Sequence, residues 1–90
     1  MTRTPLRIPK ATTLPFGYVI HIRVVSDEEF EEECGGPTDL AAWIAEERTI
    51  YLRQSRNLRQ RRADLTHEMG HAFMDWQESV LGSKFSDPKT

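Results

Sequence analysis

The chain has 90 residues and a formal net charge of −2, which is enough sequence for one small domain. Hydrophobic residues make up 38% and charged residues 29%, a balance that excludes a disordered chain. The small net charge excludes a general attraction to nucleic acid, and the best apolar run, residues 16–25, is too short and too polar to cross a membrane.

The first 25 residues divide into two segments. Residues 1–15 contain Pro5, Pro9 and Pro15, and proline disfavours helix at its own position and at the residue before it. We therefore expect an extended N-terminal arm. Residues 17–25 are rich in β-branched side chains, and apolar residues alternate with His21 and Arg23, which predicts a strand.

The middle of the chain is acidic and then apolar. Residues 26–37 read "SDEEFEEECGGP", where Ser26 suits the cap of a short helix and the glycines with Pro37 indicate a turn. Residues 39–54 fit either a helix or a hairpin. We favour two antiparallel strands, at 41–46 and 49–53, because "TIYL" is strongly β-forming and "EER" suits the loop between them.

From Asn57 the apolar residues recur with the period of a helix. Asn57 is a suitable cap and Gly82 a suitable stop, so the predicted helix runs from 57 to 81, followed by a polar tail at 83–90. Its apolar stripe comprises Leu58, Leu65, Met69, Ala72, Phe73, Trp76 and Val80. Together the segments predict one α+β domain, in which a small antiparallel or mixed sheet of about three strands packs on a long helix.

The stretch "HEMGH" lies within this helix. His67 and His71 are four residues apart and so share a face, which we expect to lie opposite the apolar stripe. Two such imidazoles can bind one Zn²⁺, and Glu68 beside them suits a general base for an attacking water. The alternative is that three polar residues share a helix by chance; the rarity of this spacing favours a metal site.

The motif and the segments before it resemble the zincin metallopeptidases, specifically the minimal zincins of the ImmA/IrrE type and the SprT-like proteins. Asp75 and Trp76 also resemble the residues that follow the motif in thermolysin-type helices. The resemblance covers roughly residues 38–78. It implies that a sheet precedes the helix, and that an edge strand, here "AAWIA", pairs with the backbone of a peptide substrate.

The resemblance also implies a third protein ligand. Gluzincins supply a glutamate from a second helix, which we do not expect in the residues after Gly82, and Gln77 stands where metzincins carry their third histidine. The candidates are therefore Asp75, Glu78 and Asp87. Asp75 is better suited to orient His71 than to bind the metal. A ligand from a second protomer, or two histidines with water, are the alternatives.

The remaining polar residues carry weaker signals. We expect His21 to be exposed on its strand and Cys34 to be inert, since no metal-binding spacing surrounds it. Five arginines precede or begin the long helix and predict a solvated face rather than a nucleic-acid contact: Arg53, Arg56, Arg59, Arg61 and Arg62. Trp43, Phe73 and Trp76 are predicted core residues.

The sequence thus predicts a zinc-dependent metallopeptidase that acts on a peptide or protein. The alternative is a non-catalytic zincin-like module that binds a protein partner, for example a phage or mobile-element accessory factor. A single cysteine and the lack of an unbroken apolar stretch at the start predict a cytoplasmic protein without membrane association.

Overall fold

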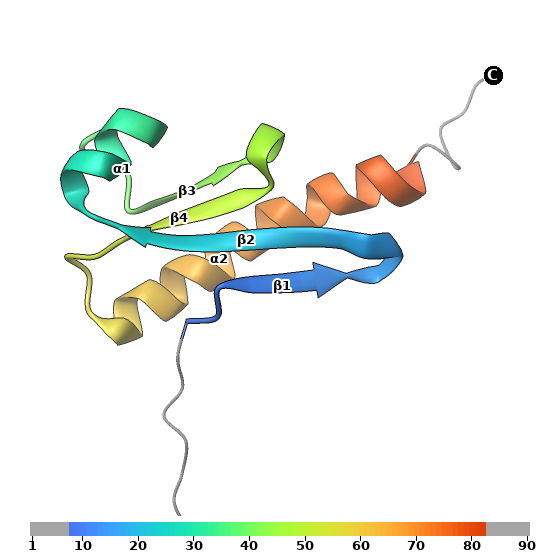
Figure 1. Cartoon of the computed structure of the whole chain (residues 1–90), viewed down its shortest axis with the longest axis horizontal. Helices are drawn as coiled ribbons and strands as arrows, with labels where there is room; N and C mark the ends of the chain where they lie inside the picture. The colour runs from blue at the N-terminus through green and yellow to red at the C-terminus, as the bar shows by residue number, and fades with distance from the viewer. Residues whose placement is uncertain (1–7, 83–90) are drawn as a thin grey trace, which may run out of the picture.

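The computed structural model of this chain describes residues 8–82. The elements are β1 (Ala11–Leu14), β2 (Tyr18–Val25), α1 (Asp27–Cys34), β3 (Ala41–Ile44), β4 (Thr49–Arg53), α2 (Leu58–Trp76) and a π-helical turn (Gln77–Gly82). The strands form one sheet in the order β1-β2-β4-β3, in which β2 and β4 are parallel and both outer pairs are antiparallel. The predicted α+β fold with a mixed sheet on a long helix is confirmed (Figure 1).

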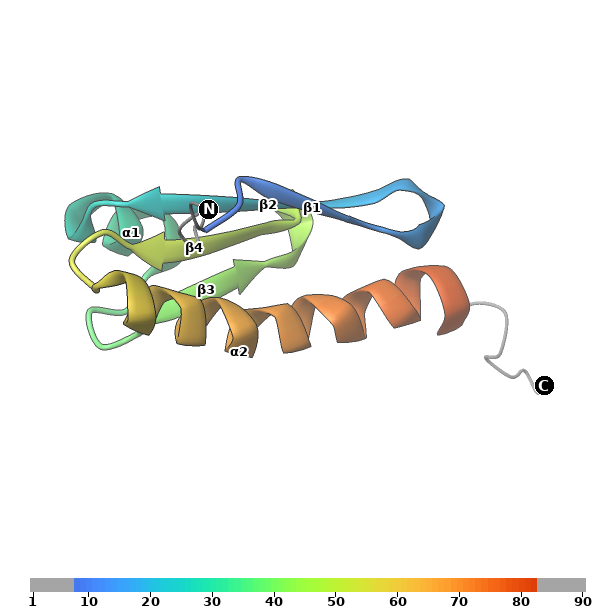
Figure 2. The ribbon, with the colours of Figure 1, turned by 90° about the horizontal axis from the view of Figure 1, so that it is seen from below.

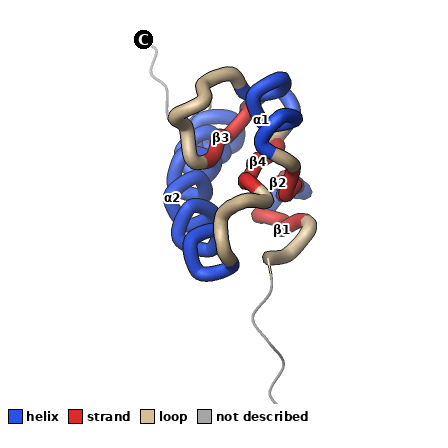
Figure 3. Tube along the Cα trace, turned by 90° about the vertical axis from the view of Figure 1, so that its left-hand side faces the viewer, coloured by secondary structure: helices blue, strands red, loops and turns tan. Residues whose placement is uncertain are grey.

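The two helices lie on opposite faces of the sheet (Figures 2 and 3). Because side chains alternate along a strand, β2 and β4 each contribute to two clusters. The cluster on the α2 face contains Tyr18, Ile20, Ile22, Ile50, Leu52, Ala72 and Trp76. The cluster on the α1 face is smaller and contains Val25, Phe30 and Tyr51. The long helix therefore packs on the larger core, and α1 covers only part of the other face.

The predicted N-terminal arm is only partly correct. Residues 1–7 lie outside the described residues, but Ala11–Leu14 form β1 and pair with β2 in an antiparallel hairpin. The sheet therefore has four strands among residues 8–82 instead of about three. β1 is short and its prolines fall outside the paired residues, so the sequence pattern alone did not separate a strand from an extended arm.

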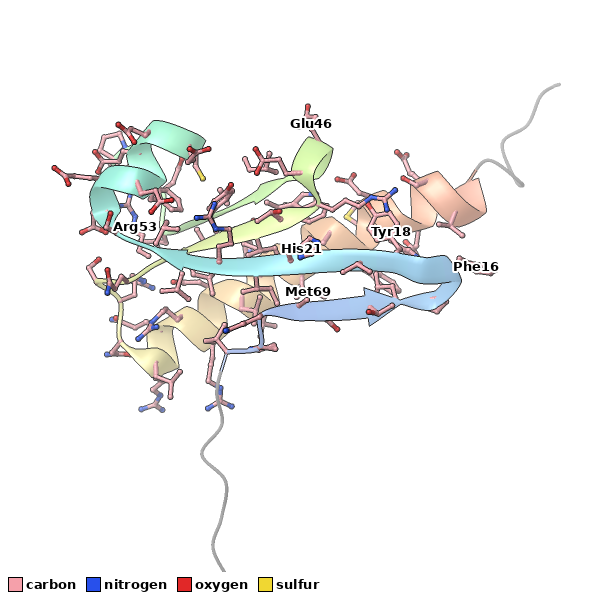
Figure 4. The ribbon with its side chains drawn as sticks, in the orientation of Figure 1. Phe16, Tyr18, His21, Glu46, Arg53 and Met69 are labelled. Carbon is pink, nitrogen blue, oxygen red and sulfur yellow. The ribbon has the colours of Figure 1, made fainter. Side chains whose placement is uncertain are left out.

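The tip of the β1–β2 hairpin holds an aromatic residue in an unusual backbone conformation. Phe16 has φ 70° and ψ 26°, in the left-handed region, and Gly17 follows with φ 71°. The pairing of Leu14 with Tyr18 leaves a loop of three residues, and glycine and asparagine adopt the left-handed conformation at the least cost. The Phe16 side chain is 74% exposed and projects from the end of the sheet (Figure 4), so it gains little burial in return.

We expect Phe16→Asn to raise the free energy of unfolding by about 1 kcal/mol, because asparagine tolerates the left-handed conformation and little buried surface is lost. Urea denaturation followed by circular dichroism measures the change. Phe16→Ala is the matched control, since it also removes the ring but lacks the side-chain amide that favours the left-handed conformation, and it should give no such gain. Equal stabilities for the two variants would contradict a backbone origin.

The long helix begins as the sequence predicts. The Asn57 side chain accepts a hydrogen bond from the Gln60 backbone N–H (2.8 Å), and the Gln60 side chain accepts one from the Asn57 N–H (3.0 Å). This capping box satisfies two of the amides that a helix start leaves without partners. The helix changes at Gln77 to a π-helical turn that ends at Gly82, and the predicted polar tail lies outside the described residues.

Two residues of the predicted apolar stripe are not core residues. Leu58 is 39% exposed and Phe73 is 43% exposed, while Ala72 and Trp76 are buried and Leu65, Met69 and Val80 pack against the core. The buried residues of α2 are Asp64, Glu68, Ala72 and Trp76. The face of the helix that packs on the sheet is therefore rotated, relative to the predicted stripe, towards these four residues. The prediction for Phe73 was therefore wrong, because the sheet contacts the other flank of the stripe.

The predicted β-hairpin at 41–53 is present, with a shorter first strand. β3 ends at Ile44, and Ala45–Glu47 form a 3₁₀ turn before Arg48 takes a left-handed conformation with φ 50°. Among residues 8–82, β3 pairs only with β4 and is therefore an edge strand, as the resemblance implied for "AAWIA". Neither helix of residues 8–82 has an apolar stretch of membrane-spanning length.

Candidate metal centre and cleft

The three residues of the motif lie on the flank of α2 that faces the edge strand β3. The side chains of His67 and His71 are exposed, whereas Glu68 is only 9% exposed. The histidines share cavities with the β3 segment, so they lie beside the sheet contact and not directly opposite the apolar stripe as the sequence predicted. The difference arises because the buried face of α2 is centred near Glu68 and Ala72.

The two imidazoles have a spacing that fits one metal ion. Their ring centroids are 5.1 Å apart with planes inclined by 78°. An ion about 2.0–2.1 Å from one nitrogen of each ring lies about 3.2 Å from each centroid, and a tetrahedral angle then separates the centroids by about 5 Å. Imidazole nitrogen is also a ligand that suits Zn²⁺. The donor chemistry and the spacing are therefore compatible with zinc on this pair.

No third His, Cys, Asp or Glu side chain within residues 8–82 joins the pair in a group that could hold a metal ion. Glu78 is exposed in the π-helical turn. Asp75 accepts a hydrogen bond from the Trp43 indole N–H (2.5 Å), instead of a bond from His71 as the sequence predicted. Asp87, the last candidate, lies outside the described residues.

A cleft runs between β3 and α2 along the motif. One cavity of about 460 Å³ is lined by Thr38, Asp39, Leu40, Ala41, Asp64, His67 and Glu68. A second of about 380 Å³ is lined by Trp43, Glu68, His71, Met74 and Asp75. Glu68 borders both cavities, with one histidine in each. We call the two together the β3–α2 cleft, and Glu68 is the residue that lines both of its cavities.

Glu68 differs from the other buried carboxylate of the cleft. Asp64 is also 9% exposed, but Arg56 donates two hydrogen bonds to it, at 2.8 and 3.0 Å. Such a bidentate pair occupies both oxygens of Asp64 and leaves neither free for chemistry. Among the described residues Glu68 takes part in no ion pair or side-chain hydrogen bond. Its carboxylate is therefore free to accept a proton from a molecule in the cleft.

The predicted arginine face is partly wrong. Arg53 is 6% exposed and buried against α1, and Arg56 is occupied by Asp64. Arg61 donates to the backbone carbonyl of Arg56 (2.8 Å), which leaves Arg59 and Arg62 as the exposed members. Three arginines that the sequence predicted to be solvated thus bind carboxylates or backbone carbonyls, and these contacts form only in the folded chain.

His21 and Cys34 have the surroundings expected of residues outside the site. His21 is exposed, and the alternation of β2 places it on the face of the sheet away from α2. It therefore cannot be the missing ligand for His67 and His71. Cys34 is the half-buried last residue of α1, and burial together with neighbouring carboxylates raises the pKa of its thiol to about 11. A thiol with so high a pKa is a poor nucleophile and a poor metal ligand at neutral pH.

Several residues that line the cleft could not be identified from the HEMGH motif. Thr38–Ala41 form its wall but look like an ordinary turn in the sequence, and Trp43 was predicted only as core. Asp64 could have been found, because it lies one turn before Glu68 and so shares its face of the helix. The Trp43–Asp75 bond joins residues 32 positions apart and follows only from the packing of β3 on α2.

Comparison with known proteins gives no family assignment. No family model matches the chain, and neither a curated protein nor a solved structure matches it significantly. The function must therefore be inferred from the residues of the cleft.

Proposed function

We propose that this chain is a zinc-dependent metallopeptidase of the minimal zincin type, acting on peptide or protein substrates in the cytoplasm. The observation that carries the proposal is Glu68: a carboxylate 9% exposed, without a partner among the described residues, in a residue that lines both cavities of a cleft with two exposed histidines. Its oxygens still contact the solvent of the cleft, since no fully buried side-chain oxygen of residues 8–82 lacks a hydrogen-bond partner, so a water molecule in the cleft can reach this carboxylate.

His67 and His71 are the residues that hold the zinc. When bound there, zinc lowers the pKa of water and polarises a peptide carbonyl. Glu68 acts as the general base, accepting a proton from the attacking water and returning it to the leaving nitrogen as the C–N bond breaks. Because Glu68 borders both cavities, it can reach a scissile bond that lies across the middle of the cleft.

The edge strand β3 is suited to bind a substrate in an extended conformation. β3 has one hydrogen-bonded neighbour, β4, and its other edge is available within the described structure to pair with a peptide backbone. Leu40 and Met74 border opposite cavities of the cleft and are 50% and 64% exposed. Exposed apolar side chains on both sides of Glu68 offer contacts to a bound peptide.

The second candidate function is a non-catalytic module that binds a protein partner in the same cleft. The observation in its favour is that no third ligand joins His67 and His71 among the described residues. Such a module would keep the cleft and the edge strand but would hold zinc weakly or not at all.

Two measurements on the same preparation separate these functions. Metal analysis after purification without added zinc gives the zinc content, and mass spectrometry after incubation with unstructured peptides detects cleavage. We expect about one zinc per chain and cleavage that a chelator stops and added zinc restores. A chain with neither zinc nor cleavage would reject the peptidase. If it still binds the same peptides, the binding module is favoured, and if it binds none of them, both functions are rejected.

A further inference from the structure

Arg53 is a buried arginine at the end of β4, with its side chain only 8% exposed. A buried charge is stable only when it is well paired. The guanidinium donates to the carbonyl oxygens of Asp39 (2.7 Å), Gly36 (3.1 Å) and Pro37 (3.3 Å). It therefore binds three backbone groups of the short turn that follows α1.

The same guanidinium also ties this turn to α1. It lies 3.0 Å from the Asp27 carboxylate and 3.6 Å from that of Glu31, and it stacks 4.2 Å from the Phe30 ring centroid. Hydrogen bonds from Ser55 and Arg53 hold the pKa of Asp27 below its ordinary value. Arg53 thus joins β4, α1 and the turn at one point, and Figure 4 shows it beside α1 at the end of the sheet.

The turn that Arg53 holds is one wall of the β3–α2 cleft. Asp39 accepts the shortest of the Arg53 bonds, and Thr38–Ala41 border the cavity that contains His67. β3 begins at Ala41, two residues after that bond. Arg53 itself lies on the α1 face of the sheet, stacked on Phe30, and so does not touch the cleft.

We propose that Arg53 is a positioning residue for this cleft: by holding the Gly36–Asp39 turn, it sets where the edge strand β3 lies against the motif helix α2. A lysine could supply the charge but not the planar set of donors that binds three carbonyls and a carboxylate at once. The consequence for substrate binding rests on the proposed peptidase function; the effect on β3 does not.

The chain carries two indole groups that can report this effect. The Trp43 indole donates to Asp75 across the interface of β3 and α2, whereas the Trp76 indole donates to the Pro15 carbonyl (3.1 Å) from α2 to the hairpin. In ¹H–¹⁵N spectra each gives a separate side-chain signal. We expect Arg53→Lys to shift the Trp43 indole signal and to accelerate its hydrogen exchange by about tenfold or more, while the Trp76 signal stays unchanged.

Arg23→Lys is the matched control. Arg23 also joins the sheet to α1, through Glu29 (3.0 Å), and it donates to the Tyr51 hydroxyl of β4 (3.5 Å). It makes no hydrogen bond to the turn, so both indole signals should stay in place. Pro37→Gly is a second test if Arg53→Lys does not fold. It loosens the same turn without altering the buried arginine, and it should also move the Trp43 signal selectively.

An unchanged Trp43 signal in Arg53→Lys, or in Pro37→Gly if the first variant does not fold, would overturn the proposal. Equal effects on both indoles would also overturn it, since they would show a general loss of stability. None of these measurements needs zinc or cleavage, so they remain valid if the peptidase proposal fails. If the peptidase proposal holds, Arg53→Lys should raise KM for a peptide and leave zinc affinity at the wild-type value, because both histidines are on α2.

Discussion

Replacement of Glu68 by glutamine is expected to lower peptide hydrolysis by about 10²–10⁴-fold, the usual contribution of a general base. Glutamine has nearly the same shape but cannot accept the proton of the attacking water. Zinc binding should persist, since His67 and His71 are unchanged. The fold should persist as well, because Glu68 makes no ion pair or side-chain hydrogen bond among residues 8–82 that the change would break.

The measurement is the rate of peptide cleavage, with zinc content and thermal unfolding determined on the same samples. Glu78→Gln is the matched control: it is the same chemical change on an exposed carboxylate of the π-helical turn, outside both cavities of the cleft. It should cleave like the wild type. Unchanged cleavage by Glu68→Gln would reject Glu68 as the base, and equal losses in both variants would indicate a general effect of charge.

The second large effect concerns the metal. We expect His67→Ala with His71→Ala to lower zinc affinity by at least about 100-fold, because even the partners that orient a ligand are worth 10–100-fold. Competition titration with a zinc-binding dye measures the change. His21→Ala provides the control, since it removes the third histidine of the chain from the face of the sheet away from α2. It should bind zinc like the wild type.

The same titration tests the third ligand. Asp75→Asn and Glu78→Gln should keep wild-type affinity, because neither carboxylate joins the histidine pair in the described structure. A loss of affinity in Asp87→Asn would identify Asp87 as the ligand, whereas wild-type affinity in all three variants would favour water or a second protomer. Full zinc binding by the double histidine variant would show that the metal site is elsewhere.

The sequence by itself determined the parts of this protein that depend on near neighbours along the chain. Asn57 and Gln60 cap α2 because a capping box needs only residues three apart. His67 and His71 share one side of that helix for the same reason. The alternation in residues 17–25 and the loop expected at "EER" likewise predicted β2 and the hairpin of β3 with β4.

Only the tertiary structure decided which surfaces meet. Glu68 is buried and Phe73 exposed because β3 and β4 contact one flank of α2, a choice that the apolar pattern of the helix leaves open. Residues 11–14 could be assigned as a strand only from their pairing with β2. Arg53 and Arg56 look like solvated charges until the fold brings Asp27, the Gly36–Asp39 turn and Asp64 to them. Local spacing fixes the direction of a side chain on its own helix or strand, whereas its burial and its partners depend on contacts between segments far apart in the chain.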